Sequence, residues 1–149
     1  MNADKYDAAV ELGGSTVPTG QSRDLRRWWS VITNLIAFAV LMEAVFAGAM
    51  LSGVGWARTA HAVNATFVVA SAFIAGLICV ITLRGISTGF KLGLTLLSLA
   101  AAVLIQAAVG AYSAKGTNLL WIHTPLGVAL FGFATRAAAG ARRLPGSDV

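Results

Sequence analysis

Four long apolar runs dominate the chain and constrain its fold more than any other feature. They cover approximately residues 29–52, 60–83, 90–112 and 119–139. A helix of about 20 residues, rising ~1.5 Å per residue, crosses the ~30 Å hydrocarbon core of a bilayer. The connections between the runs are short, which is typical of antiparallel neighbouring helices. The sequence therefore predicts an all-α, integral membrane bundle of four transmembrane helices within residues 28–139.

Composition excludes several other classes of protein. Hydrophobic residues make up 57% of the chain and charged residues only 11%, whereas a soluble domain of this length needs far more charge to cover its surface. The single cysteine, Cys79, lies inside an apolar run, which rules out an intramolecular disulfide and a cysteine-based metal site. The basic residues form no cluster on a polar helix, so we expect the bilayer rather than nucleic acid as partner.

The distribution of Lys and Arg predicts the orientation, because cytoplasmic loops are enriched in both residues. An N-terminus inside the cell leaves only Arg58 and Lys115 outside. Both ends, residues 1–27 and 140–149, are then cytoplasmic tails, and the first helix acts as its own insertion signal. Nine basic residues lie on the cytoplasmic side in this orientation: Lys5, Arg23, Arg26, Arg27, Arg84, Lys91, Arg136, Arg142 and Arg143.

The two halves of the chain share a spacing of polar and small residues. His61 precedes His123 by 62 positions, and Gly48 precedes Gly110 by the same number. Glu43 precedes Gln106 by 63 positions, which is almost the same spacing. This pattern indicates a duplicated helical hairpin, and the alternative is a chance match among abundant small residues.

Two histidines are the most informative polar residues within the apolar runs. His61 and His123 each lie near the start of a run that begins outside, so they are expected at similar depth near the outer face. Two imidazoles from facing helices are suitable axial ligands for a low-spin haem b iron. The alternative is a pair of ordinary interfacial histidines. A bare transition metal is disfavoured, because no carboxylate or thiolate is expected at the same level.

The neighbouring polar and small residues each have a functional and a structural interpretation. Glu43 is a candidate proton or quinol contact, or an acceptor for an imidazole N–H, or a hydrogen-bonded link between helices. Gln106 is a candidate cofactor contact or an interhelical link, and Asn64 an interhelical link. Gly110 and Gly127 would leave room for a flat macrocycle. Arg58 and Lys115 would pair with haem propionates or remain solvated loop charges.

These residues resemble one half of the haem A synthase family. The resemblance covers residues 29–139 and rests on Gln106, Gly110 and the sequence His123-Thr-Pro-Leu-Gly, with His61 as the partner histidine. It implies a four-helix bundle that holds haem between His61 and His123 on the outer side. The chain departs from the family in having one such half, and in having Ala62 where the family usually has Arg. The chain is also similar to small bacterial four-helix membrane proteins of the same build.

These observations predict a small b-type haem protein, similar to a cytochrome b, that spans the bacterial plasma (inner) membrane several times. It would transfer electrons or handle haem, and no catalytic residue is predicted. One alternative is a cofactor-free structural or assembly subunit of a larger membrane complex. The other is half of a homo-oligomeric haem-modifying enzyme, in which two chains rebuild the double bundle.

Overall fold

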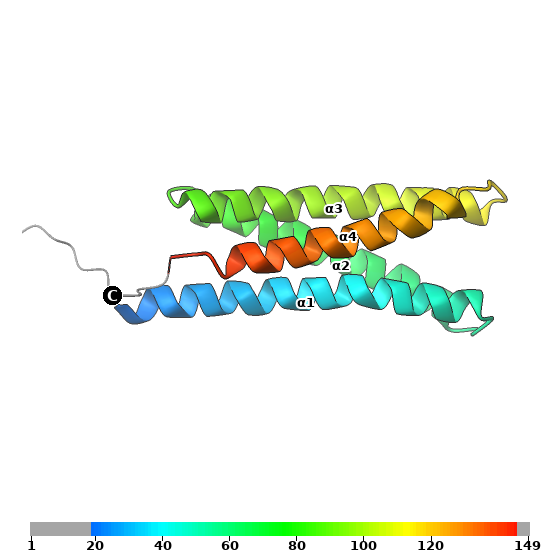
Figure 1. The fold of residues 1–149 in the computed structure, drawn as a ribbon, viewed down its shortest axis with the longest axis horizontal. Coiled ribbons are helices and arrows are strands. Elements are labelled where there is room, and N and C mark those ends of the chain that lie inside the picture. Colours follow the sequence, from blue (N-terminus) through cyan, green and yellow to red (C-terminus); the bar gives the residue numbers. More distant parts are fainter. Residues whose placement is uncertain (1–18, 146–149) are drawn as a thin grey trace, which may run out of the picture.

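The computed structural model describes residues 19–145, and its described part consists of four α-helices without any strand. These are α1 (Thr19–Leu51), α2 (Ala57–Thr82), α3 (Ser87–Ala114) and α4 (Leu120–Ala141). The expected all-α fold with four helices is confirmed. Figure 1 shows that the axes of the four helices are nearly aligned.

Three helices, α1, α2 and α3, begin earlier than the apolar runs. The helix α1 starts at Thr19, so residues 19–27, which the sequence assigned to a polar tail, continue the helix. The helix α2 starts at Ala57, which places Arg58 in its first turn instead of in the preceding loop. The rest of the two predicted tails, including Lys5, lies outside the described residues.

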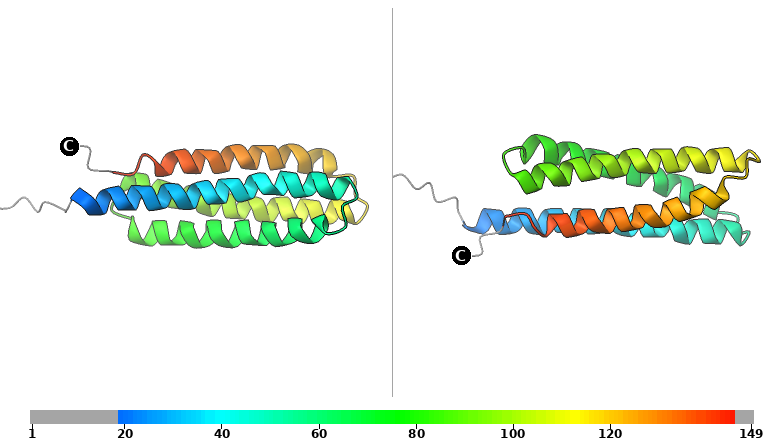
Figure 2. Two further views of the ribbon diagram at one scale, coloured as in Figure 1. Left: turned by 90° about the horizontal axis from the view of Figure 1, so that it is seen from below. Right: turned by 45° about the horizontal axis from the view of Figure 1, so that its top comes forward.

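The helices are arranged in a ring in chain order. Each helix contacts its two neighbours, α4 closes the ring against α1, and the described residues show no contact between α1 and α3 or between α2 and α4. The helices α2 and α4 are therefore diagonal and run in the same direction. The α1–α2 and α3–α4 connections lie together at one end of the bundle, and the start of α1 and the end of α4 lie at the other (Figures 1 and 2).

The packed core occupies the half of the bundle nearest the start of α1. Its largest fully buried side chains include Leu96, Leu99 and Leu144. In α2 and α3, Gly76 and Gly93 allow close approach, because a β-carbon at Gly93 would lie 2.8 Å from the backbone nitrogen of Val80. Small residues at such crossings are typical of helices that pack in a membrane.

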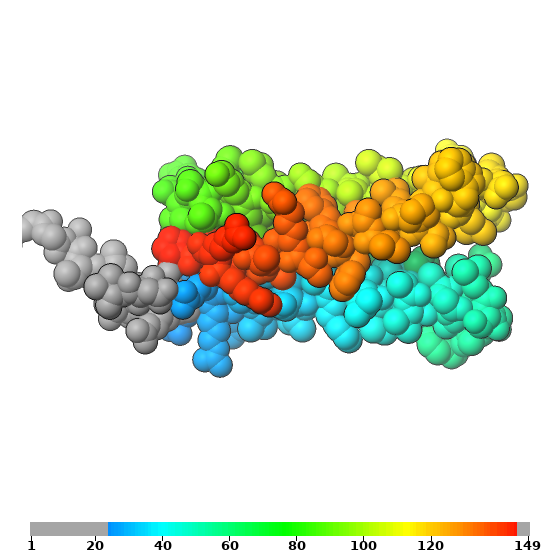
Figure 3. Space-filling view, in the orientation of Figure 1, coloured from blue at the N-terminus to red at the C-terminus, as the bar shows by residue number. Residues whose placement is uncertain are grey.

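The other half of the bundle is more open. In the described chain, α1 has no buried residue after Val40, α3 has none after Val103, and α4 has none before Leu130. Pro125 lies inside α4, where its missing N–H and its ring bend a helix. The first turns of α4 incline towards α3 and away from α1, as Figure 1 and the right-hand view of Figure 2 show. Figure 3 shows the furrow that this divergence leaves between α4 and α1.

The outer surface of the bundle is apolar. Large side chains such as Leu35, Phe67, Ile81 and Ile105 are more than half exposed, which is unfavourable in water and suited to lipid. Three helices, α1, α2 and α3, are long and apolar enough to span a membrane. The helix α4, which contains His123, Pro125 and Arg136, is not among these three.

Candidate functional site

The first hairpin brings Glu43, His61 and Asn64 together between α1 and α2. Nδ1 of His61 lies 2.6 Å from Oε2 of Glu43, and both side chains are about one-fifth to one-quarter exposed, at 24% and 19%. The contact does not have the direction of a ring N–H···O hydrogen bond and is a close approach of the two side chains. Asn64 Nδ2 donates to Oε1 of Glu43 and, at 2.8 Å, to the carbonyl oxygen of Ala39. The carboxylate of Glu43 thus contacts α2 through both of its oxygens.

The second hairpin brings Gln106, Gly110, His123 and Gly127 together between α3 and α4. Gln106 Nε2 donates to the carbonyl oxygen of His123 at 2.7 Å. A β-carbon at Gly110 would lie 2.8 Å from Cε1 of His123, so the imidazole ring rests directly on the α3 backbone. A β-carbon at Gly127 would lie 3.3 Å from Nε2 of Gln106. The two glycines therefore make room for side chains of the neighbouring helix.

The fold brings the two histidines to the same end of the bundle on diagonal helices. His61 is in the second turn of α2, and His123 is in the first turn of α4. Both rings are partly exposed and lie in the open half of the bundle.

The two nitrogens of each ring differ in their surroundings. Nδ1 is buried in both His61 and His123, and in neither ring does it make a directed hydrogen bond. Nε2 makes no hydrogen bond in either ring. It is also not one of the buried unpaired atoms among the described residues. Each ring therefore keeps one accessible nitrogen. At His61, the carboxylate of Glu43 beside Nδ1 favours the tautomer with its proton there and the lone pair on Nε2.

The remaining predicted site residues have less specific positions. Arg58 is exposed, one helical turn before His61. Lys115 is exposed at the end of α3, where its Nζ lies 5.6 Å from the centre of the Tyr112 ring in a cation–π contact. Both cations lie at the same end of the bundle as the histidines. The spaces beside Gly110 and Gly127, expected to be open to a macrocycle, are filled by the His123 ring and by the Gln106 amide.

The side chains present limit which metal centre the site can form. The described residues contain no group of three or more His, Cys, Asp or Glu side chains that could hold a metal ion. Two imidazoles alone do not complete the coordination of a bare ion, but they do complete that of a metal that brings four ring nitrogens of its own. The donor set therefore suits a porphyrin better than an ion.

Sequence reasoning did not identify the backbone partners of the site. The carbonyl groups of Ala39 and His123 accept the two interhelical amide hydrogen bonds, and no side-chain pattern marks such acceptors. Asn64 was expected to link helices, and the structure places it in contact with the Glu43 carboxylate as well. In comparisons with known proteins, no family model, no curated protein and no solved structure matches the chain.

Proposed function

We propose that the chain is a four-helix membrane protein that holds one haem b between His61 and His123 and serves in electron transfer or haem handling. The observation that supports this proposal is that two histidines on diagonal helices lie at the same, more open end of the bundle, each with an Nε2 that makes no hydrogen bond. The resemblance to half of haem A synthase favours the same two residues as ligands.

In this proposal the chain contributes two axial imidazoles and an acceptor beside one of them. A bound haem supplies a reversible one-electron couple at its iron. His61 and His123 would hold the haem iron through Nε2, and the Glu43 carboxylate beside Nδ1 of His61 would favour the ring state that leaves Nε2 free to ligate. The exposed cations Arg58 and Lys115 lie at the end of the bundle where propionates would emerge. The furrow between α4 and α1 provides an approach from the membrane side (Figure 3).

We further propose that α4 spans the membrane with the other three helices and that both termini are cytoplasmic. At ~1.5 Å per residue, the 22 residues of α4 reach about 33 Å, enough for the hydrocarbon core. The bias in Lys and Arg supports the orientation: among the described residues only Arg58 and Lys115 lie at the histidine end. The bacterial plasma membrane is the compartment that the resemblance favours.

An absorption spectrum of the protein purified gently from its native host tests the haem proposal. We expect a low-spin b-type spectrum with about one haem per chain. His61→Ala and His123→Ala should each give a high-spin spectrum or lose haem, because iron then lacks an axial ligand. Thr66→Val is a matched control on α2, because the Thr66 hydroxyl is exposed and bonds only within its own helix. A colourless protein would refute the proposal.

A cofactor-free subunit of a larger membrane complex is the second candidate function. The observation that favours it is the mutual contact of Glu43, His61 and Asn64. It already engages three of five polar residues in the apolar runs, the other two being Gln106 and His123. In that case the apolar outer faces pack against other subunits. Pull-down from solubilised native membranes should then recover defined partners together with a colourless chain. The histidine variants should recover the same partners.

A further inference from the structure

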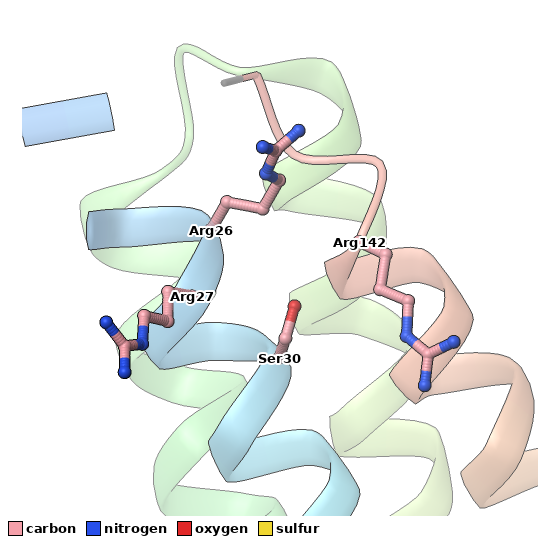
Figure 4. Close-up of a pocket in the computed structure, with 4 residues that line it drawn as sticks. All are labelled: Arg26, Arg27, Ser30 and Arg142. Atoms are coloured by element: carbon pink, nitrogen blue, oxygen red, sulfur yellow. The ribbon is translucent and has the colours of Figure 1, made fainter. Parts of the chain in front are cut away.

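A cavity lined by arginines lies at the end of the bundle remote from the histidines. It has a volume of about 480 Å³ and is lined by Arg26, Arg27 and Ser30 of α1 and by Arg142 at the end of α4. Figure 4 shows Arg26, Ser30 and Arg142 around the opening between the two helices, and the guanidinium of Arg27 directed away from them on the outer side of α1. None of these residues takes part in the candidate haem site.

The chemistry of the lining selects for an anion. None of the described residues that line the cavity carries a carboxylate, and Asp24 is the one acidic residue at this end of the described chain. Arg142 reaches across to α1, where its Nη2 lies 3.5 Å from Oδ1 of Asn34, a long contact that leaves its other donors for a ligand. Guanidinium groups match phosphate oxygens with two parallel hydrogen bonds, which makes arginine the preferred residue for phosphate.

The surface below the cavity distinguishes a lipid from a soluble phosphate. On α1, Phe38, Leu41 and Val45 follow Arg27 at helical spacing on the same side of the helix. They are 59%, 41% and 51% exposed. This apolar stripe begins at the basic end of a helix that is apolar enough to span a membrane. A soluble anion would make no contact with this stripe, whereas an acyl chain attached to the bound phosphate would lie along it.

We propose that this arginine cavity binds the phosphate headgroup of an anionic phospholipid, whose acyl chain packs along Phe38, Leu41 and Val45. Basic sites between helices at the cytoplasmic side of a membrane recognise headgroups in this way. The lipid would link the start of α1 to the end of α4, the two segments that close the ring of helices. The proposal does not depend on haem binding.

Native mass spectrometry of the full chain in detergent tests the site. The probes are phosphatidylglycerol, phosphatidylcholine and inorganic phosphate. We expect retention of phosphatidylglycerol over phosphatidylcholine, and a loss of about fivefold in affinity for Arg27→Gln and for Arg142→Gln, the size expected for one basic residue at an anionic lipid surface. Arg143→Gln is the control, because Arg143 is the exposed neighbour of Arg142 and does not line the cavity. It should retain the lipid as the wild type does.

Two results would overturn the proposal. Equal loss of lipid in all three arginine variants would mean that net charge alone attracts the lipid. Binding of inorganic phosphate that displaces phosphatidylglycerol and requires Arg142 would mean that the ligand is a free phosphate. Thermal unfolding of each variant without lipid separates loss of the site from loss of the fold. Arg27 is exposed on α1, so Arg27→Gln keeps the test decisive if the Arg142 variant unfolds.

Discussion

The imidazole of His123 rests directly on Gly110, where a β-carbon would lie 2.8 Å from its Cε1 atom. The glycine at the corresponding place in the first hairpin, Gly48, has no atom within 4 Å of such a β-carbon. The two hairpins therefore hold their histidines differently: His123 lies against backbone, and His61 lies against the Glu43 carboxylate. This difference makes the two glycines a matched pair for experiment.

Gly110→Ala should lower the free energy of unfolding by ~1–3 kcal/mol, because the added methyl group forces the His123 ring to move. Unfolding in mixed micelles, followed by circular dichroism, gives this value. Gly48→Ala is the control and should be neutral or slightly stabilising, since alanine favours helix over glycine. Equal destabilisation by both changes would show that the ring contact has no energetic role.

Glu43→Gln should destabilise the protein despite the similar shape of the amide. Glu43 meets a donor of Asn64 with one oxygen and Nδ1 of His61 with the other, and an amide has one oxygen and one NH₂ group. With its oxygen towards Asn64, the amide sets its NH₂ group against Nδ1 of His61 and replaces a charged contact by a neutral one, which should cost ~0.6–1.7 kcal/mol, the range of hydrogen bonds in membrane proteins. Asp24→Asn changes the same charge at an exposed position and should have no effect. Unchanged unfolding of Glu43→Gln would contradict the double contact.

The same substitution is expected to weaken haem binding in titrations of the apoprotein. An amide NH₂ facing Nδ1 of His61 moves the ring proton to Nε2 and removes the lone pair that would ligate iron. Glu43→Asp keeps the acceptor and should bind more haem than Glu43→Gln. The opposite order would show that Glu43 does not orient the ring.

The two interhelical amides should contribute unequal amounts to stability. Gln106→Leu removes the hydrogen bond to the His123 carbonyl, and Asn64→Leu removes the one to Ala39. We expect a loss of ~1 kcal/mol for Gln106→Leu and a larger loss for Asn64→Leu, because Asn64 also donates to Glu43. Thr66→Val should be neutral. If Gln106→Leu proved the more damaging change, the importance of the Glu43 contact would be refuted.

Substitution of Gly93 tests the close crossing of α2 and α3. Gly93→Ala should cost ~1–3 kcal/mol, because the backbone nitrogen of Val80, as well as side-chain atoms of Val80 and Cys79, lies within 3 Å of the new methyl group. Gly132→Ala, at a helical glycine with open space around it, should be neutral. Equal unfolding free energies for the two variants would place the helices further apart than described.

Labelling of single cysteines in intact cells tests the proposed topology. In a Cys79→Ala background, cysteines at Gly55 and Lys115 should react with an impermeant reagent from outside, and one at Gly85 should not. All three positions are exposed, and the first two lie at the end of the bundle opposite the third. The reverse pattern would place both termini outside and refute the positive-inside argument.

The sequence allowed the helices, but not their ends, to be predicted. Apolar runs mark the parts that lie in lipid, so the polar start of α1 at Thr19 and the position of Arg58 within α2 carried no such signal. The five polar residues inside the bundle stood out because polar groups are rare there. Their pairing was not available from spacing, because which face of each helix turns inward depends on crossing geometry. The spacing also could not show that Gly110 accommodates the imidazole of His123. Nor could it show that Arg142 lines the same cavity as Arg26 and Arg27 where α4 meets α1.

The contacts within each hairpin have a consequence for the order in which the chain assembles during synthesis. Glu43 finds both of its partners on α2, the very next helix. Roughly 60 residues separate the end of α2 from the end of α4, so at about 5–20 residues per second the ribosome needs several seconds to complete the bundle. During that interval the carboxylate already has His61 and Asn64 beside it. The most costly group in the membrane is thus sheltered by the first two helices alone, before the second pair is inserted.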